Sequence, residues 1–97
     1  MRPLTFSDLE TAARAVATKP LACRPAAAAI IVKTAQSADR YRQRRGHYHP
    51  VWGSGTLYSA SCNLRLATKD QLYAPEGLPS FVAVLGAVLS LGTDQET

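Results

Sequence analysis

The segment from Pro25 to Gly46 constrains the fold of this chain more than any other feature. Proline is tolerated in the first turn of a helix, where its missing N–H costs nothing, and glycine suits the position just after a helix. In between, small and apolar residues recur every three or four positions in two adjacent rows. The rows are Ala27, Ile30, Thr34, Ser37 and Tyr41, and Ala28, Ile31, Ala35 and Ala38. The pattern predicts a long helix over residues 21–45 with a shallow face that another helix can approach closely.

A shorter helix is predicted ahead of it, over residues 7–18. Ser7 followed by Glu10 fits a capping box, in which each side chain satisfies a backbone donor at the helix start. The apolar face of this helix comprises Leu9, Ala12, Ala13 and Val16. Pro20 ends the segment because the residue before a proline leaves the helical dihedral angles. The two helices are predicted to form an antiparallel hairpin over residues 7–45.

The rest of the chain is predicted to add a loop and two shorter helices. Residues 46–55 form the loop, and residues 56–67 form a helix that Ser54 or Thr56 can cap. A final helix covers residues 79–91, where apolar residues occur on every side and a buried strand is the alternative. The chain is thus predicted to be a single all-α domain, residues 1–97, with about four helices.

Composition favours a cytoplasmic protein. No apolar run reaches the roughly 18 residues that a membrane span requires. Asp8 and Glu10 stand where an export signal would be apolar. The two cysteines, Cys23 and Cys62, are too few to stabilise a fold of this size by disulfide cross-linking. They also lack the spacing of a metal site. We therefore expect a cytoplasmic location and no membrane partner.

Positive charge is concentrated in the first half of the chain. Residues 1–50 hold nine lysines and arginines against three acidic residues, a net charge of +6, whereas residues 51–97 carry −2. Four arginines end the predicted long helix: Arg40, Arg42, Arg44 and Arg45. Arginine binds phosphate through a bidentate fork, so these residues, with Lys33 as an outlying contributor, are candidate DNA-phosphate contacts. The alternative is a solvated helix end, where cations interact favourably with the helix dipole and Asp39 pairs with Arg42.

Other motifs do not favour catalysis or metal binding. His47 and His49 form an H-x-H pair, but no acidic or cysteine partner follows at the spacing of a zinc site. The segment Gly53-Ser54-Gly55-Thr56 lacks the lysine of a phosphate-binding loop and suits a tight turn with a helix cap. No nucleophile is paired with a base, and no pair of carboxylates stands out. We expect no enzymatic activity, no catalytic residue, no metal and no cofactor.

The apolar segment 79–91 is the other informative feature. A helix that is apolar on every side either fills the centre of a fold or is half-buried in a neighbouring subunit. Because an alanine-rich domain of this size has limited room to cover it, self-association is expected, with an intramolecular core as the alternative. Aromatic residues of the loop are further candidate anchors. The predicted oligomer or partner interface comprises Ile30, Ile31, Tyr41, Trp52, Phe81, Leu85, Val88 and Leu89.

Three short motifs carry a family resemblance. They are A-A-R-A at Ala12–Ala15, A-D-R-Y at Ala38–Tyr41 and H-P-V-W-G-S-G-T-L at His49–Leu57. These motifs resemble a short family of Rhodobacter-type alphaproteobacteria that is associated with gene transfer agents, and the resemblance spans most of residues 1–67. The family resembles the small terminases of these particles.

The resemblance implies a non-catalytic DNA-packaging accessory protein. Such a protein is helical and homo-oligomeric, and it presents double-stranded DNA to the large terminase subunit. Gene transfer agents package host DNA with little sequence choice, so binding would be non-specific and dominated by phosphate contacts. The alternative is a protein–protein adaptor or regulatory module of a phage-like particle with no nucleic-acid contact. Tyr48, Val51 and Trp52 would be its anchors.

Overall fold

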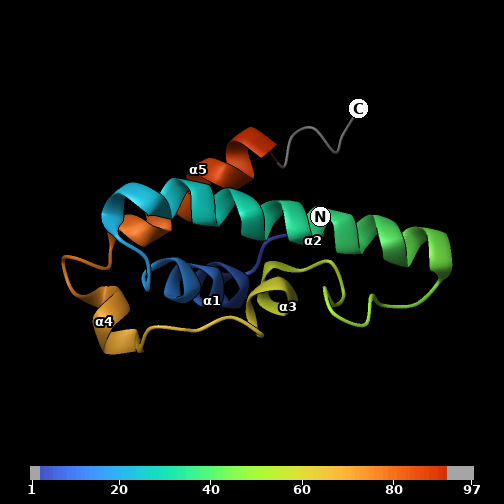
Figure 1. The fold of residues 1–97 in the computed structure, drawn as a ribbon, viewed down its shortest axis with the longest axis horizontal. Helices are drawn as coiled ribbons and strands as arrows, with labels where there is room; N and C mark the ends of the chain where they lie inside the picture. The colour runs from blue at the N-terminus through green and yellow to red at the C-terminus, as the bar shows by residue number, and fades with distance from the viewer. Residues whose placement is uncertain (1–2, 92–97) are drawn as a thin grey trace.

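The computed structural model describes residues 3–91, and its regular structure is helical (Figure 1). The elements are α1 (Phe6–Val16), the short 3₁₀ turn η1 (Leu21–Cys23), α2 (Arg24–Arg45), α3 (Leu57–Ser61), α4 (Lys69–Tyr73) and α5 (Pro79–Leu91). Within the described range, strand-like pairing is limited to an isolated bridge between His49 and Gly53. The predicted all-α class is confirmed, with one α-helix more than the sequence predicted.

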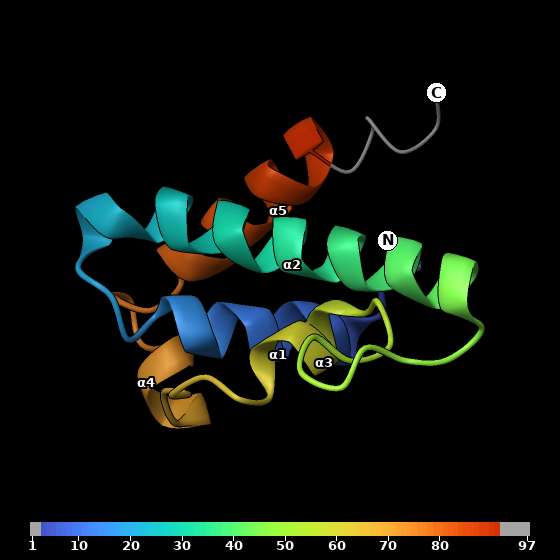
Figure 2. The ribbon, with the colours of Figure 1, turned by 45° about the vertical axis from the view of Figure 1, so that its right-hand side comes forward.

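The long helix α2 is the central element of the fold. α1 runs antiparallel to it, which confirms the predicted hairpin, and α5 crosses α2 while also contacting α1 (Figures 1 and 2). Alanine and valine dominate the junction, so the helix backbones approach one another closely. Residues of this core that are at most 1% exposed include Ala12, Ala13, Val16, Ala28, Val32, Ala35, Leu57, Leu72 and Val84.

Different residues from those predicted cap the start of α1. The Thr5 hydroxyl accepts a hydrogen bond from the Asp8 N–H at 3.2 Å, and Asp8 Oδ2 accepts one from the Thr5 N–H at 3.0 Å. The predicted Ser7–Glu10 capping box is therefore wrong. Asp8 Oδ1 also accepts a hydrogen bond from the backbone N–H of Tyr58 at 3.0 Å, so the same side chain attaches α1 to α3. This contact with α3 favours the Thr5–Asp8 capping box over the predicted Ser7–Glu10 box.

The third helix is shorter than the predicted range 56–67. α3 begins after Thr56, whose hydroxyl caps it, and ends at Ser61. The chain then runs in a non-helical conformation beside the end of α1. The Ala67 N–H donates to the Arg14 carbonyl at 3.0 Å, and Arg14 Nε donates to the Ala67 carbonyl at 2.7 Å. These bonds to α1 replace the helical bonds that the prediction assumed.

α4 lies between the predicted ranges 56–67 and 79–91, where the sequence predicts no helix. It starts with a capping box formed by Thr68 and Gln71, a pattern that was present in the sequence. The Tyr73 hydroxyl donates to Glu10 at 2.5 Å, and Lys69 Nζ lies 3.6 Å from the same carboxylate. The hydrogen bond from Tyr73 lowers the pKa of Glu10 below its ordinary value and raises the pKa of Tyr73. Glu10, predicted to cap α1, therefore holds α4 instead.

α5 is a helix over the predicted range 79–91, so the strand alternative is wrong. One side of α5 is buried against the core through Ser80, Val84 and Ala87. The opposite side is apolar and open to solvent, because Val82 is 72% exposed and Leu85 is 40% exposed. The helix is therefore only half covered by its own chain.

Candidate nucleic-acid interface

Two glycines determine how the chain leaves α2 and returns to it. Gly46 has a left-handed φ of 76°, donates its N–H to the Arg42 carbonyl at 2.9 Å and ends α2 at the predicted position. Gly55 has a φ of 95° and lies against α2, where an added Cβ atom would be 2.8 Å from the Cβ of Asp39. Both its conformation and the lack of space require glycine. The loop over residues 46–56 is thus held on the last turns of α2.

His49 organises the tip of this loop. Its Nδ1 atom accepts hydrogen bonds from the backbone N–H groups of Val51 at 3.0 Å and Trp52 at 2.9 Å. Because Nδ1 accepts, the ring proton lies on Nε2. The imidazole also stacks on the Trp52 ring, with centroids 4.1 Å apart, and contacts the Tyr41 ring edge-on at 4.7 Å. His49 therefore connects the loop tip to α2.

The histidines have packing roles in this loop. The His47 ring contacts Tyr41 edge-on at 5.5 Å, on the same aromatic residue that His49 touches. Across residues 3–91, no three histidine, cysteine or acidic side chains are grouped so that they could hold a metal ion.

Arg42 forms an ion pair within the protein. Its Nη2 donates to Asp39 Oδ1 at 2.8 Å, and Gln43 Nε2 donates to Oδ2 at 3.3 Å. Burial raises the pKa of Asp39, the hydrogen bond from Arg42 lowers it, and the net value lies below the ordinary one. The pair that the sequence suggested is present, so Arg42 is the least available of the four arginines for DNA.

The other arginines are exposed on the last turns of α2. Arg40 and Arg44 share a helix face with the exposed Lys33, because the three positions are separated by seven and four residues. We call these three residues the basic ridge, which extends over about 16 Å of helix. Among the residues that the structure describes, no carboxylate forms an ion pair with the ridge or with Arg45.

A hollow of about 260 Å³ lies between the basic ridge and the loop. Its lining consists of Ser37, Arg40, Tyr41, Arg44, Arg45 and Trp52, and we call it the basic hollow. The guanidinium carbon of Arg45 is 5.6 Å from the centroid of the Tyr41 ring, within cation–π range. Trp52 remains 41% exposed. Cations beside aromatic rings are the chemistry that binds phosphates and stacks on nucleic-acid bases.

The sequence predicts the arginines as phosphate contacts but does not predict the hollow. It places Ser37 in a helix row, and it predicts Tyr41 and Trp52 as residues of a partner interface. The spacing along α2 gives one indication that these residues share a surface, since Ser37 and Arg40 lie one helical turn before Tyr41 and Arg44 respectively. The position of Trp52 beside them depends on the path of the loop and has no local pattern.

The predicted interface residues divide by exposure. Ile30, Trp52, Leu85 and Leu89 are between 40% and 70% exposed. Tyr41, Phe81 and Val88 are partly buried. Ile31 is only 4% exposed and packs in the core, because the α2 row containing Ile31 faces α1 and α5, whereas Ile30 lies on the neighbouring row.

A continuous apolar surface lies where α5 crosses the start of α2. Two adjoining hollows share Pro25, Val82 and Ala83 in their linings. We call this surface the apolar groove; its apolar residues include Leu21, Pro25, Leu78, Val82, Ala83 and Gly86, and the largely buried Arg24 and the hydroxyl residue Ser90 also line it. α5 contains no charged residue. Exposed apolar patches of this kind are typical of interaction sites.

These features define a small all-helical domain with a basic, aromatic-lined end and an apolar groove. The chain belongs to the family described as Domain of unknown function (DUF7742), whose model matches residues 2–88. Comparison with curated proteins and with solved structures gives no match. No helix in the described part of the chain combines the length and the apolar character that crossing a membrane would need.

Proposed function

We propose that the protein is a non-catalytic DNA-packaging accessory protein of the small-terminase type. It acts in the cytoplasm as a homo-oligomer, binds double-stranded DNA non-specifically and assists a large terminase. The observation that carries the proposal is the basic hollow with its adjoining ridge. Trp52, the loop residue that completes the hollow, lies within the H-P-V-W-G-S-G-T-L motif at His49–Leu57, on which the family resemblance also rests.

The composition of the ridge favours phosphate contact over base reading. Lys33, Arg40 and Arg44 are long, exposed cations on one helix face. Arginine can also contact guanine edges, but the ridge carries no amide side chain, and the amide of the nearby Gln43, which could read adenine, is hydrogen-bonded to Asp39. Phosphate contacts give affinity without sequence choice and depend strongly on salt. This matches the needs of a protein that packages DNA of any sequence.

The apolar groove supports self-association. A second copy of the chain is the occupant we propose, because an uncharged helix offers a charged partner nothing to pair with, whereas it complements itself across a two-fold axis. Gly86 faces open space, since an added Cβ atom would meet nothing within 4 Å. Another helix could therefore approach closely at this point.

A DNA-binding measurement on charge-matched variants tests the packaging function. Arg40→Ala/Arg44→Ala removes two ridge cations, and Lys19→Ala/Lys69→Ala removes two exposed cations elsewhere. We expect the ridge variant to bind DNA about tenfold or more weakly at low salt. The slope of log affinity against log salt concentration should fall in magnitude by about two. The control should stay within about twofold of the parent. Equal losses in both variants would show a response to net charge alone and would contradict the proposal.

A protein–protein adaptor is the second candidate. Ile30, Val51 and Leu64 are 65%, 63% and 47% exposed and surround a small hollow beside Trp52. Exposed aromatic and aliphatic residues in a cluster are typical anchors for a protein partner. If the parent protein does not retain DNA even at low salt, the adaptor becomes the better explanation of this surface.

A further inference from the structure

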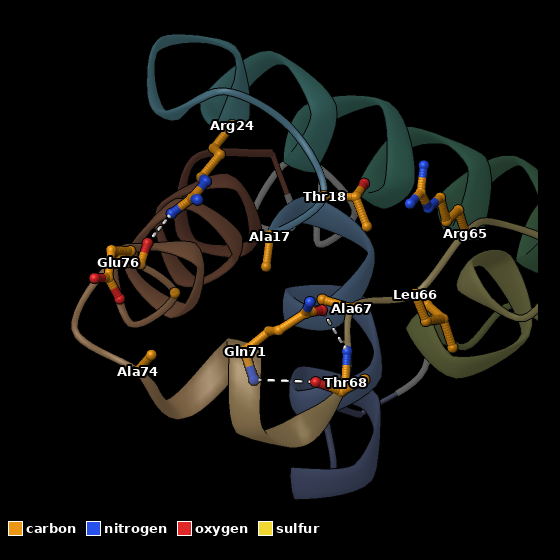
Figure 3. Close-up of a pocket in the computed structure, with 11 residues that line it drawn as sticks. Ala17, Thr18, Arg24, Arg65, Leu66, Ala67, Thr68, Gln71, Ala74 and Glu76 are labelled. Carbon is orange, nitrogen blue, oxygen red and sulfur yellow. Dashed lines mark hydrogen bonds between the residues drawn. The ribbon is translucent and has the colours of Figure 1, made fainter.

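A second polar pocket lies at the start of α2, at the other end of this helix from the basic hollow (Figure 3). It has a volume of about 640 Å³ and opens between the end of α1, the start of α2 and the segment that contains α4. Arg24 and Arg65 line it together with Thr18, Thr68 and Gln71. Pockets of this size hold small organic molecules. Neither function proposed above uses it.

Arg24 brings a positive charge to this pocket that no carboxylate neutralises within residues 3–91. The residue is 8% exposed. Its Nε donates to the Lys19 carbonyl at 3.1 Å, and its Nη1 donates to the Glu76 carbonyl at 2.6 Å. In Figure 3 the carboxylate of Glu76 is directed away from the guanidinium. Within the described residues, the hydrogen-bond partners of this buried guanidinium are neutral carbonyl groups.

The place of Arg24 in the chain adds to the positive potential. Arg24 is the first residue of α2, at the end where the helix dipole is positive. A cation there is unfavourable for the helix, and its burial is unfavourable as well. A bound anion would relieve both costs, because it would neutralise the guanidinium and meet the positive end of the dipole.

The other polar groups of the pocket provide hydrogen-bond donors along it. Gln71 Oε1 accepts from the Thr68 N–H at 3.0 Å, which leaves the side-chain NH₂ group of Gln71 able to donate. In Figure 3 this amide lies between the two arginines, and Arg65 stands at the opposite end of the pocket from Arg24. Arg65 is exposed and has no ion pair among the described residues. Donors at both ends and in the middle fit an elongated molecule with an acidic group at each end.

We propose that this pocket binds a small organic or inorganic dianion, with one oxyanion group at Arg24 and the other at Arg65. We call it the dianion pocket. Carboxylates and phosphates both accept the paired hydrogen bonds that a guanidinium donates, so the shared chemistry is that of an oxyanion. The proposal is independent of DNA binding, since it uses no residue of the basic ridge or the basic hollow.

Titration of the full chain followed by nuclear magnetic resonance tests the proposal. The probes are succinate, inorganic pyrophosphate and, as a singly charged comparison, acetate. We expect the Gln71 side-chain NH₂ signals to shift and saturate with at least one dianion at a Kd of about 1 mM or tighter. Acetate should bind at least about tenfold more weakly. Saturation by succinate alone identifies a carboxylate ligand, and saturation by pyrophosphate alone identifies a phosphate ligand.

Three variants distinguish a pocket that binds a dianion from a pocket whose polar residues only stabilise the fold. Gln71→Glu keeps the capping box, because glutamate makes the same bond to the Thr68 N–H, but it replaces a donor with a negative oxygen. This variant should fold normally and lose about tenfold or more in affinity, and Arg65→Gln should lose about fivefold or more. Arg44→Gln, at the other end of α2, should stay within about twofold of the parent. If no dianion saturates, or if Arg44→Gln weakens binding as much as Arg65→Gln, the proposal is wrong.

Discussion

The Nδ1 atom of His49 accepts the backbone N–H of Trp52 at 2.9 Å, while the two rings stack with their planes 10° apart. One side chain thus closes the turn and supports one side of the indole. The loop tip has no regular secondary structure beyond a pair of backbone bonds between His49 and Gly53, both 3.1 Å long. The position of the exposed tryptophan therefore depends on a residue only three places before it.

Two substitutions at His49 separate these roles. Asparagine can accept the same two backbone hydrogen bonds through its side-chain oxygen, but it cannot stack. We expect His49→Asn to keep the turn and His49→Ala to lose it, with alanine costing about 1–2 kcal/mol more of unfolding free energy. Trp52 fluorescence and urea unfolding measure the two effects. Equal behaviour of the two variants would mean that the hydrogen bonds to Nδ1 do not hold the loop.

Gly55→Ala tests the attachment of the loop to α2. The added methyl group would lie 2.8 Å from the Cβ of Asp39, and the φ of 95° is unfavourable for alanine. We expect a loss of about 1–3 kcal/mol in unfolding free energy, measured by chemical denaturation. Gly46→Ala is the matched control, since its φ of 76° is also left-handed but its Cβ would meet nothing within 4 Å. A cost at Gly55 no larger than at Gly46 would rule out the close contact with Asp39.

Asp39 should make the stability of the domain depend on pH in the acidic range. Its pKa in the folded protein lies below the ordinary 3.8, so the unfolded state binds the proton more readily. The stabilisation is therefore fully present above that value and is lost as the pH falls through the folded pKa. At pH 7, Asp39→Asn should lower the unfolding free energy by about 1–3 kcal/mol, and the difference from the parent should shrink with acidification.

The control for this prediction is Asp70→Asn, on the exposed surface of α4. We expect it to change stability by no more than about 0.5 kcal/mol. Urea unfolding of all three proteins at neutral and acidic pH provides the comparison. A difference between Asp39→Asn and the parent that stays constant with pH would contradict the linkage.

Gly86→Ala should affect folding and association in opposite directions. Within one chain the new methyl group meets nothing, and alanine favours a helix over glycine by about 0.5–1 kcal/mol. At concentrations too low for association the thermal midpoint should therefore rise, while a close helix contact with a second copy should weaken. Native mass spectrometry measures the association. Val82→Glu is the companion variant, and it should abolish the proposed self-association because it places a charge in the apolar groove.

A monomeric parent protein would contradict the role of this groove. Leu72→Ala contrasts with the groove variants because it should lower stability. Leu72 is fully buried, and its truncation should cost about 2–5 kcal/mol of unfolding free energy.

Tyr73→Phe tests the contact that joins α4 to α1. Removing the hydroxyl removes the hydrogen bond that does most to lower the pKa of Glu10. The pKa of Glu10 should therefore rise toward its ordinary value of 4.5, which carboxyl chemical shifts followed against pH would measure. An unchanged titration would mean that the hydroxyl does not bond to Glu10 in solution.

The hairpin and the last helix could be predicted because their determinants are local. Pro25 and Gly46 bound α2, and the alanine rows between them indicate which side packs. The segment after Thr56 could not be read in the same way. Its path depends on Asp8 binding Tyr58 and on Arg14 pairing with Ala67, contacts between residues that are about fifty positions apart.

The candidate site was predictable in part for the same reason. The arginines at the end of α2 and the Asp39–Arg42 pair follow from helix spacing. The hollow between Arg44 and Trp52 does not, because it exists only once the loop returns against α2 at Gly55.

The length of α2 determines how far apart the two proposed anion-binding sites lie. Arg24 and Arg45 are its first and last residues, so about 32 Å of continuous helix stands between the dianion pocket and the basic hollow. That span is about four Debye lengths at physiological ionic strength, and a charge bound at one end is screened from the other. Two acidic molecules could therefore occupy one copy of the chain in either order, with neither repelling the other.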